Sequence, residues 1–214
     1  MGSVTEEGDD RYVQLMGADL GPAFEVLSND LILIHANWEV YTQLFSDHER
    51  MDLLMQAAGG LFALLRHALL FDVVLLLAKL VDKPDTGGKP NLTLQCLPEL
   101  VSAACDDLGF QSKVEAMVQE SCTACQFAVQ WRHKRIAHRD RGVALGTAEM
   151  PLPQFEPSDI DDALSKAASV LNTVESFFSC GAHTAYSLLS LGQPDSLFYF
   201  LKRGMEAENA DAGL

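Results

Sequence analysis

The stretch GLFALLRHALLFDVVLLLAKLV, residues 60–81, decides the fold of this chain. Together with the residues from Glu49 onward, it predicts one long helix that closes at Asp82-Lys83-Pro84. Its second half is apolar on every side, so we expect it to be the central and nearly buried helix, with a bend at Gly59-Gly60. This stretch also carries four ionisable side chains: Arg66, His67, Asp72 and Lys79. Each would cost several kcal/mol in a bilayer, and we therefore expect no membrane span.

Helical periodicity dominates the rest of the chain as well. Apolar residues recur at three- and four-residue spacings, and no stretch alternates as a half-buried strand does. Further helices are predicted at about residues 22–45, 93–108, 111–139, 158–189 and 196–205. The predicted fold is all-α, an up-and-down helical bundle of four to six helices. Its predicted organisation is a flexible acidic tail at 1–20, one domain at 21–206 and a flexible tail at 207–214.

The composition limits the partners of the chain. The formal net charge is −15, which disfavours tight nonspecific binding to RNA because that needs many cationic contacts to phosphates. The 5 cysteines form an odd set, and no signal-like segment opens the sequence. Reduced thiols in the cytoplasm are therefore expected rather than a disulfide framework.

One short segment opposes this acidic background. The stretch WRHKRIAHRDR, residues 131–141, holds 5 of the 15 Lys and Arg residues and 2 of the 6 histidines. Such a segment marks a place where an anion can dock, and Lys134, Arg135, Arg139 and Arg141 are the candidate phosphate-binding residues. The alternative is a solvated helix end, where cations favour the negative pole of the helix dipole.

Arg132 and His138 are the candidate catalytic residues of this segment. An arginine fork binds phosphate with two hydrogen bonds, and histidine moves protons near neutral pH, so the pair suits phosphodiester cleavage without a metal. On an ideal helix, six steps of 100° place the two side chains about 120° apart. Either Arg132 reaches back toward His138, or the site is shared with the same segment of a second subunit.

A zinc site is the rival interpretation of the region. Cys122, Cys125, His133 and His138 are ligand-like residue types. A continuous helix advances about 24 Å over this span, whereas zinc ligands lie within ~2.3 Å of the metal. We therefore expect no metal and no cofactor, with the two cysteines facing the core.

The segment Arg132-His133-Lys134-Arg135-Ile136-Ala137-His138 resembles the signature of HEPN domains, an arginine followed by a polar residue and then by histidine. The wider pattern resembles the HEPN branch named for abortive-infection U-type phage-resistance proteins. In that branch a helix like Leu61–Val81 precedes a loop, a segment like Asn91–Leu94 and the later motif helix.

The resemblance implies a bundle that dimerises through its motif helices and, in active members, a metal-independent ribonuclease. Arg132 and His138 would form the catalytic pair, with His133 at the polar position. Some members use a further acidic residue, for which Asp72 and Asp82 are both candidates.

The resulting hypothesis is a toxin-like or phage-defence endoribonuclease that acts on RNA as a homodimer, with a possible antitoxin or regulatory protein as partner. The alternative is a noncatalytic HEPN-like helical interaction module that binds a protein or nucleotide partner.

Overall fold

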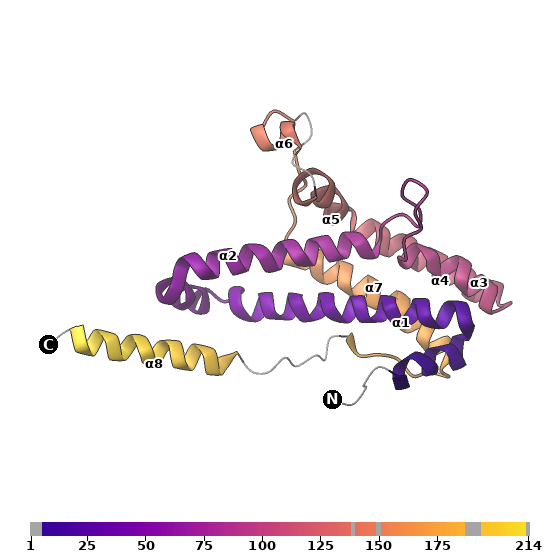
Figure 1. The fold of residues 1–214 in the computed structure, drawn as a ribbon, viewed down its shortest axis with the longest axis horizontal. Coiled ribbons are helices and arrows are strands. Elements are labelled where there is room, and N and C mark those ends of the chain that lie inside the picture. The colour runs from indigo at the N-terminus through magenta and orange to yellow at the C-terminus, as the bar shows by residue number, and fades with distance from the viewer. Residues whose placement is uncertain (1–5, 138–139, 149–150, 187–193, 213–214) are drawn as a thin grey trace. The chain divides into compact units, whose positions relative to one another are not determined.

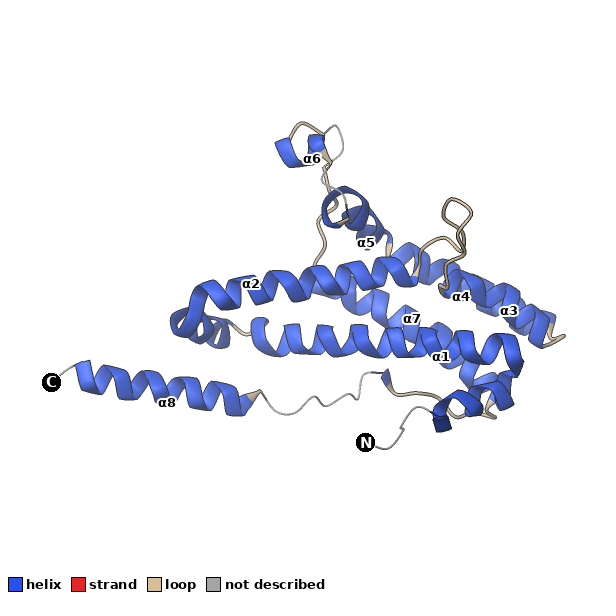
Figure 2. Cartoon of the chain, in the orientation of Figure 1, coloured by secondary structure: helices blue, strands red, loops and turns tan. Residues whose placement is uncertain are grey.

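The fold is all-α, as predicted. The computed structural model describes residues 6–137, 140–148, 151–186 and 194–212, and in these ranges every regular element is helical (Figure 2). The α-helices are α1 Glu6–Phe45, α2 His48–Leu80, α3 Leu97–Ala104, α4 Leu108–Ala124, α5 Gln126–Trp131, α6 Arg141–Leu145, α7 Pro157–Phe178 and α8 Asp195–Ala212 (Figure 1). A 3₁₀ turn, Leu94–Cys96, precedes α3, and a π-helical turn, Arg132–Ile136, follows α5.

The chain divides into two compact units. Unit 1 comprises Met1–Ile34 and Val74–Ser187, and unit 2 comprises His35–Val73 and Leu188–Leu214. Helices α1 and α2 each contribute to both units: most of α1 belongs to unit 1, and most of α2 belongs to unit 2. Helix α8 occupies most of the expected C-terminal tail, since it continues to Ala212.

The expected flexible tail at 1–20 is helical from Glu6 in the structure. Gly17 has φ 87° and ψ 175°, a conformation that glycine adopts easily and that interrupts α1. A Cβ on Gly21 would lie 2.5 Å from the carbonyl oxygen of Tyr12, so the first part of α1 runs directly against the second. Met16 and Leu20 are buried, which explains why an acidic segment stays folded here.

Helix α2 bends where the sequence indicates but is less buried than expected. The backbone leaves helical geometry at Ala58, next to Gly59-Gly60. Leu61 and Leu64 are 55% and 65% exposed, whereas burial concentrates in the last turns of the helix. The buried residues there are Val73, Val74, Leu77, Ala78 and Leu80. Helix α2 thus has more apolar surface than the other helices of the chain cover.

By length and composition alone, α2 is able to cross a membrane. Its most apolar 18-residue window has a mean hydropathy of 2.1, and 22% of that window is buried. A core helix of a soluble protein passes the same test, so the absence of a membrane span stays a prediction.

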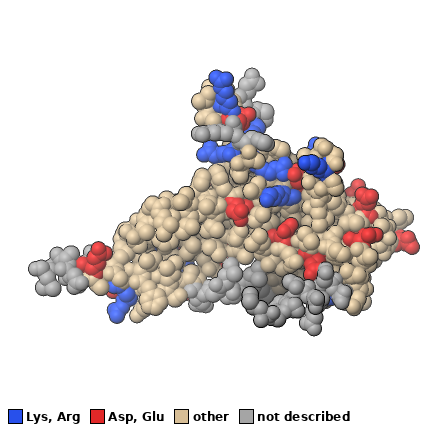
Figure 3. All heavy atoms as spheres, in the orientation of Figure 1, with Lys and Arg blue, Asp and Glu red and all other residues tan. Residues whose placement is uncertain are grey.

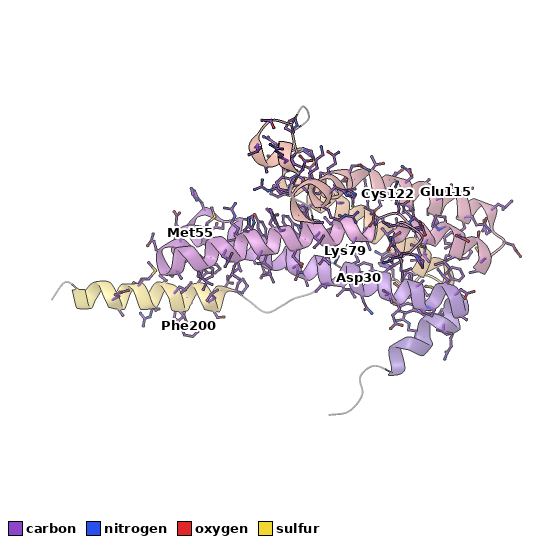
Figure 4. All side chains as sticks on the ribbon, turned by 45° about the horizontal axis from the view of Figure 1, so that its top comes forward. Asp30, Met55, Lys79, Glu115, Cys122 and Phe200 are labelled. Carbon is purple, nitrogen blue, oxygen red and sulfur yellow. The ribbon has the colours of Figure 1, made fainter. Side chains whose placement is uncertain are left out.

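In unit 1, helices α4 and α7 pack along one another and form much of the core. Val114 and Val118 of α4 and Leu171 of α7 are buried. At the end of this contact the rings of Phe110 and Phe177 stack with centroids 3.8 Å apart. Asp30 of α1 and Lys79 of α2 lie on neighbouring helices of the same unit (Figure 4). The positive charge of Lys79 stabilises the charged carboxylate of Asp30.

Arg50 contacts α8 within unit 2. Arg50 donates to the carboxylate of Asp195 at 2.6 Å, and its guanidinium lies 4.8 Å from the centroid of the Phe198 ring. Asn37 and Asp72 join the α1 and α2 parts of this unit through a 2.7 Å hydrogen bond. A single cation thus makes both the ionic and the aromatic contact that dock α8 within unit 2.

Glu175 is the buried charge that fastens the ends of unit 1 together. Its carboxylate is 1% exposed and accepts hydrogen bonds from the hydroxyl of Tyr12 at 3.1 Å and from Thr184, through the backbone N–H at 2.7 Å and the hydroxyl at 2.9 Å. Arg11 lies 3.5 Å away and supplies a compensating charge. A buried carboxylate is stable in its charged form only with such a set of donors.

We predict that Glu175→Ala lowers the free energy of unfolding by about 2–3 kcal/mol, because it leaves partly buried donors of Tyr12 and Thr184 without an acceptor. Urea denaturation followed by circular dichroism measures the change. Glu115→Ala on the exposed side of α4 is the matched control and should shift stability by less than about 0.5 kcal/mol. Equal effects of the two substitutions would contradict this account of Glu175.

Candidate functional site

The periodicity predicted one continuous helix that ends in the basic segment. The structure instead interrupts this helix before the segment. Helix α4 ends at Ala124, Cys125 has φ −85° and ψ 4°, and α5 begins at Gln126. The hydroxyl of Thr123 donates to the carbonyl of Gln119 at 2.8 Å, a side-chain bond of the kind that bends helices. The prediction of one helix over 111–139 is therefore wrong, and the motif follows a separate short helix, α5.

The arginine of the motif opens a π-helical turn. The N–H of Ala137 donates to the carbonyl of Arg132 at 2.9 Å, a bond over five residues instead of four. The 100° step of an α-helix does not apply within such a turn, and neither does the 120° separation derived from it. Turns of this kind occur often at functional sites. His138 and Arg139 lie outside the described residues.

Arg132 is held by a carboxylate from a distant part of the chain. Its Nη1 lies 2.5 Å and its Nη2 3.2 Å from the two carboxylate oxygens of Asp82, a bidentate ion pair between side chains that are 15% and 23% exposed. Asp82 follows the end of α2, so the pair ties that end to the motif. Of the two acidic candidates, Asp82 is therefore the one that reaches Arg132, while Asp72 accepts from Asn37 in unit 2.

The charge of Asp82 is stabilised by this contact. Burial by itself raises the pKa of the Asp82 carboxyl, but three favourable effects outweigh it: the hydrogen bond from Arg132, the one from the backbone N–H of Lys83, and the positive charges of Arg132 and His133. The net pKa lies below its ordinary value. Asp82 thus stays ionised and paired at neutral pH.

His133 completes the contacts of the guanidinium. Its Nε2 lies 3.2 Å from Nη2 of Arg132. The donor and acceptor roles in this contact depend on the tautomer of the imidazole. The polar residue after the motif arginine therefore helps to orient that arginine.

The candidate phosphate-binding residues spread over several elements of unit 1. Lys134 is half-buried and Arg135 exposed on the π turn, and Arg141 is exposed at the start of α6. The guanidinium of Arg135 lies 5.7 Å from the centroid of the Trp131 ring. Trp131 is itself fixed by donating from Nε1 to the carbonyl of Pro153 at 2.8 Å. The basic segment therefore packs against the ring of Trp131, which is itself held in place by a hydrogen bond.

The space-filling view shows where these cations gather. Lys and Arg cluster around α5, α6 and the loop after α2, whereas Asp and Glu appear as separate patches on the rest of the face shown (Figure 3). The motif predicted part of this cluster but missed Lys83 and Lys89 of that loop, both of which are exposed. The only signal for them in the sequence was the presence of two lysines in the loop that follows the central helix.

The residues of the rival zinc site do not assemble in the described ranges. There, no three His, Cys, Asp or Glu side chains lie close enough to hold a metal ion. Cys125 is fully buried, and burial raises the pKa of its thiol to about 12. Cys122 is half-buried, and burial raises its pKa as well (Figure 4). Both thiols thus keep their protons at neutral pH, and the charged form that binds metals is disfavoured.

Fold and motif together define a helical protein of the HEPN type. The model of the HEPN family described as AbiU2 matches residues 17–191, which is most of the chain. The chain therefore belongs to this abortive-infection family, as its sequence pattern suggested. Comparisons with curated proteins and with solved structures gave no match.

We predict that Asp82 contributes to the pH dependence of folding. Its native pKa is lowered, so its contribution is complete above the ordinary carboxyl pKa of about 4 and is lost as the pH falls through the lower native value. Asp82→Asn has no proton to take up there and should lose less stability between pH 7 and pH 3 than the unsubstituted protein. Urea midpoints measured across that range test this, and parallel curves for the two proteins would rule it out.

Proposed function

We propose that this chain is a metal-independent endoribonuclease of the HEPN type, a toxin-like or phage-defence effector that cleaves RNA with Arg132 and His138. The proposal rests on the bidentate ion pair between Asp82 and Arg132, the first residue of the π turn. It gives the motif arginine a fixed, partly buried position, which a merely solvated cation at a helix end does not have.

Arg132 keeps free donors for a phosphate. A guanidinium has five N–H groups, and the described contacts use three of them, two toward Asp82 and one toward His133. The remaining N–H groups, on Nε and Nη1, can bind a nonbridging phosphate oxygen. There the arginine would stabilise the extra negative charge of the pentacoordinate transition state.

The proton transfers fall to His138 in this proposal. A neutral imidazole removes the proton of a ribose 2′-hydroxyl, and the oxygen attacks the adjacent phosphorus. The bond from phosphorus to the 5′-oxygen of the next nucleotide then breaks, and an imidazolium supplies a proton to that oxygen. The products are a 2′,3′-cyclic phosphate and a free 5′-hydroxyl, and no metal takes part.

We further propose that the site is shared by two copies of the chain. A twofold axis would bring two equal motif segments together and double every cation and imidazole. Such an enzyme acts on RNA in the cytoplasm, and a toxic one needs an antitoxin or another regulatory protein to restrain it.

Cleavage in excess chelator tests the activity. We expect Arg132→Ala and His138→Ala to lower the rate at least 100-fold, because each removes a group that acts in the transition state. Arg132→Lys should also fail, since lysine keeps the charge but not the fork that binds Asp82 and phosphate together. Arg203→Ala on α8 is the control and should keep full activity.

Gel analysis of a defined RNA with end-group mapping gives the readout, and urea denaturation verifies that each variant folds. RNA left intact by the well-folded protein would favour the alternative, a noncatalytic interaction module.

Mixing two inactive variants tests whether the site is shared. If Arg132 of one copy works with His138 of the other, a mixed dimer of Arg132→Ala and His138→Ala contains one intact site. Random exchange of subunits then restores roughly one quarter of the wild-type activity. If each copy holds a complete site, the mixture stays inactive, and that result would contradict the shared site while leaving the nuclease proposal intact.

A further inference from the structure

The loop between α2 and the 3₁₀ turn, residues 83–90, is joined to the motif at its base. The preceding residue, Asp82, binds Arg132 on one side. On the other side the Nε2 of Gln95 donates to the carbonyls of Val81 at 2.7 Å and Asp82 at 3.1 Å. The start of the loop is therefore fixed between the motif and the entry to α3.

The loop is a folded hairpin with a regular turn at its tip. Thr86 and Lys89 exchange backbone hydrogen bonds of 3.0 and 3.4 Å. Gly87 and Gly88 between them have φ of 65° and 79°, as a two-residue type I′ turn requires. Asp85 Oδ1 also accepts from the N–H of Gly88 at 3.0 Å. The tip thus has a defined shape without any contribution from a ligand.

Asn91 closes the hairpin at its other end. Its backbone N–H donates to the carbonyl of Pro84 at 2.7 Å. Its side-chain Nδ2 donates to the carbonyl of Lys83 at 3.0 Å and to the hydroxyl of Thr86 at 2.9 Å. A loop held in this way loses little conformational entropy on binding.

The two lysines of the loop are available for an anion. Lys83 and Lys89 are exposed, and neither forms an ion pair with another described residue. The carboxylates in and just before the loop are engaged, Asp82 with Arg132 and Asp85 with the N–H of Gly88. In a chain with a net charge of −15, free cations at this place extend the cationic surface of the motif (Figure 3).

We propose that this hairpin is a preorganised arm that binds the phosphate backbone of single-stranded RNA and continues the surface of the motif. This inference depends on the proposed function, in which RNA is the ligand. A strand of phosphates fits better than one compact anion, because the free cations lie on three separate elements: the hairpin, the π turn and α6. The arm therefore increases the affinity for RNA and directs the strand along the protein surface. Cleavage itself is carried out by the residues of the motif.

Salt-dependent binding tests the arm apart from cleavage. A fluorescent single-stranded RNA is titrated in chelator with the His138→Ala protein, which leaves the RNA intact. Each phosphate contact to a single strand contributes ~0.7 to the slope of log affinity against log salt. Removing Lys83 and Lys89 by a double alanine substitution should weaken binding several-fold at low salt and reduce that slope by about 1.4.

A matched double substitution controls for net charge. Lys113 of α4 and Lys202 of α8 are also exposed and without an ion pair in the described ranges. Their double alanine variant removes the same charge and should leave the slope unchanged. Equal slopes for the two double variants, or no binding of RNA by the parent protein at low salt, would overturn the arm.

A third variant separates the shape of the arm from its charge. Asn91→Ala keeps both lysines but removes the hydrogen bonds to Lys83 and Thr86, so binding should weaken with little change in the slope. Unchanged affinity would overturn the claim of preorganisation. RNA binding that depends on the two lysines, without cleavage by the unsubstituted protein, would support the arm and refute the nuclease.

Discussion

The ion pair between Arg132 and Asp82 is the constraint on which the candidate site depends. It joins the end of α2 to the π turn, and it does so with both nitrogens of the fork and both oxygens of the carboxylate. Because the two side chains are mostly shielded from water, losing either partner would leave a charge in an unfavourable setting. The pair therefore fixes where the motif arginine points and also where the hairpin after α2 begins.

This coupling contributes to a cluster of cations in unit 1, in a chain whose net charge is −15 (Figure 3). Lysines of the hairpin and basic residues of the π turn and α6 belong to the same unit, and the Arg132–Asp82 pair links two of these elements. Elsewhere the negative charge of the protein would repel a nucleic acid. A ligand with phosphates would therefore be guided to this cluster, whereas the net charge of the whole chain disfavours binding of nucleic acid by charge alone.

The sequence pattern predicted the helices better than their interruptions. Thr93 was expected to start a helix, and its hydroxyl accepts from the N–H of Gln95 at the 3₁₀ turn. The break at Cys125 was missed because apolar spacing continues across it, and the π turn at Arg132 was missed because residue types alone carry no record of a local change in hydrogen bonding. The burial of α2 was overestimated for a related reason: apolar composition shows what a helix is able to bury, not what covers it.

By itself, the sequence determined the all-α class, the family pattern and the place of the basic motif, since these follow from local spacing and residue type. Only the tertiary structure decided between Asp72 and Asp82 and placed the lysines of the hairpin beside the motif. Asp82 and Arg132 are 50 residues apart, and no local pattern records their meeting. That pairing depends on which side chains leave water together when the helices pack, a property of the whole unit rather than of any one segment.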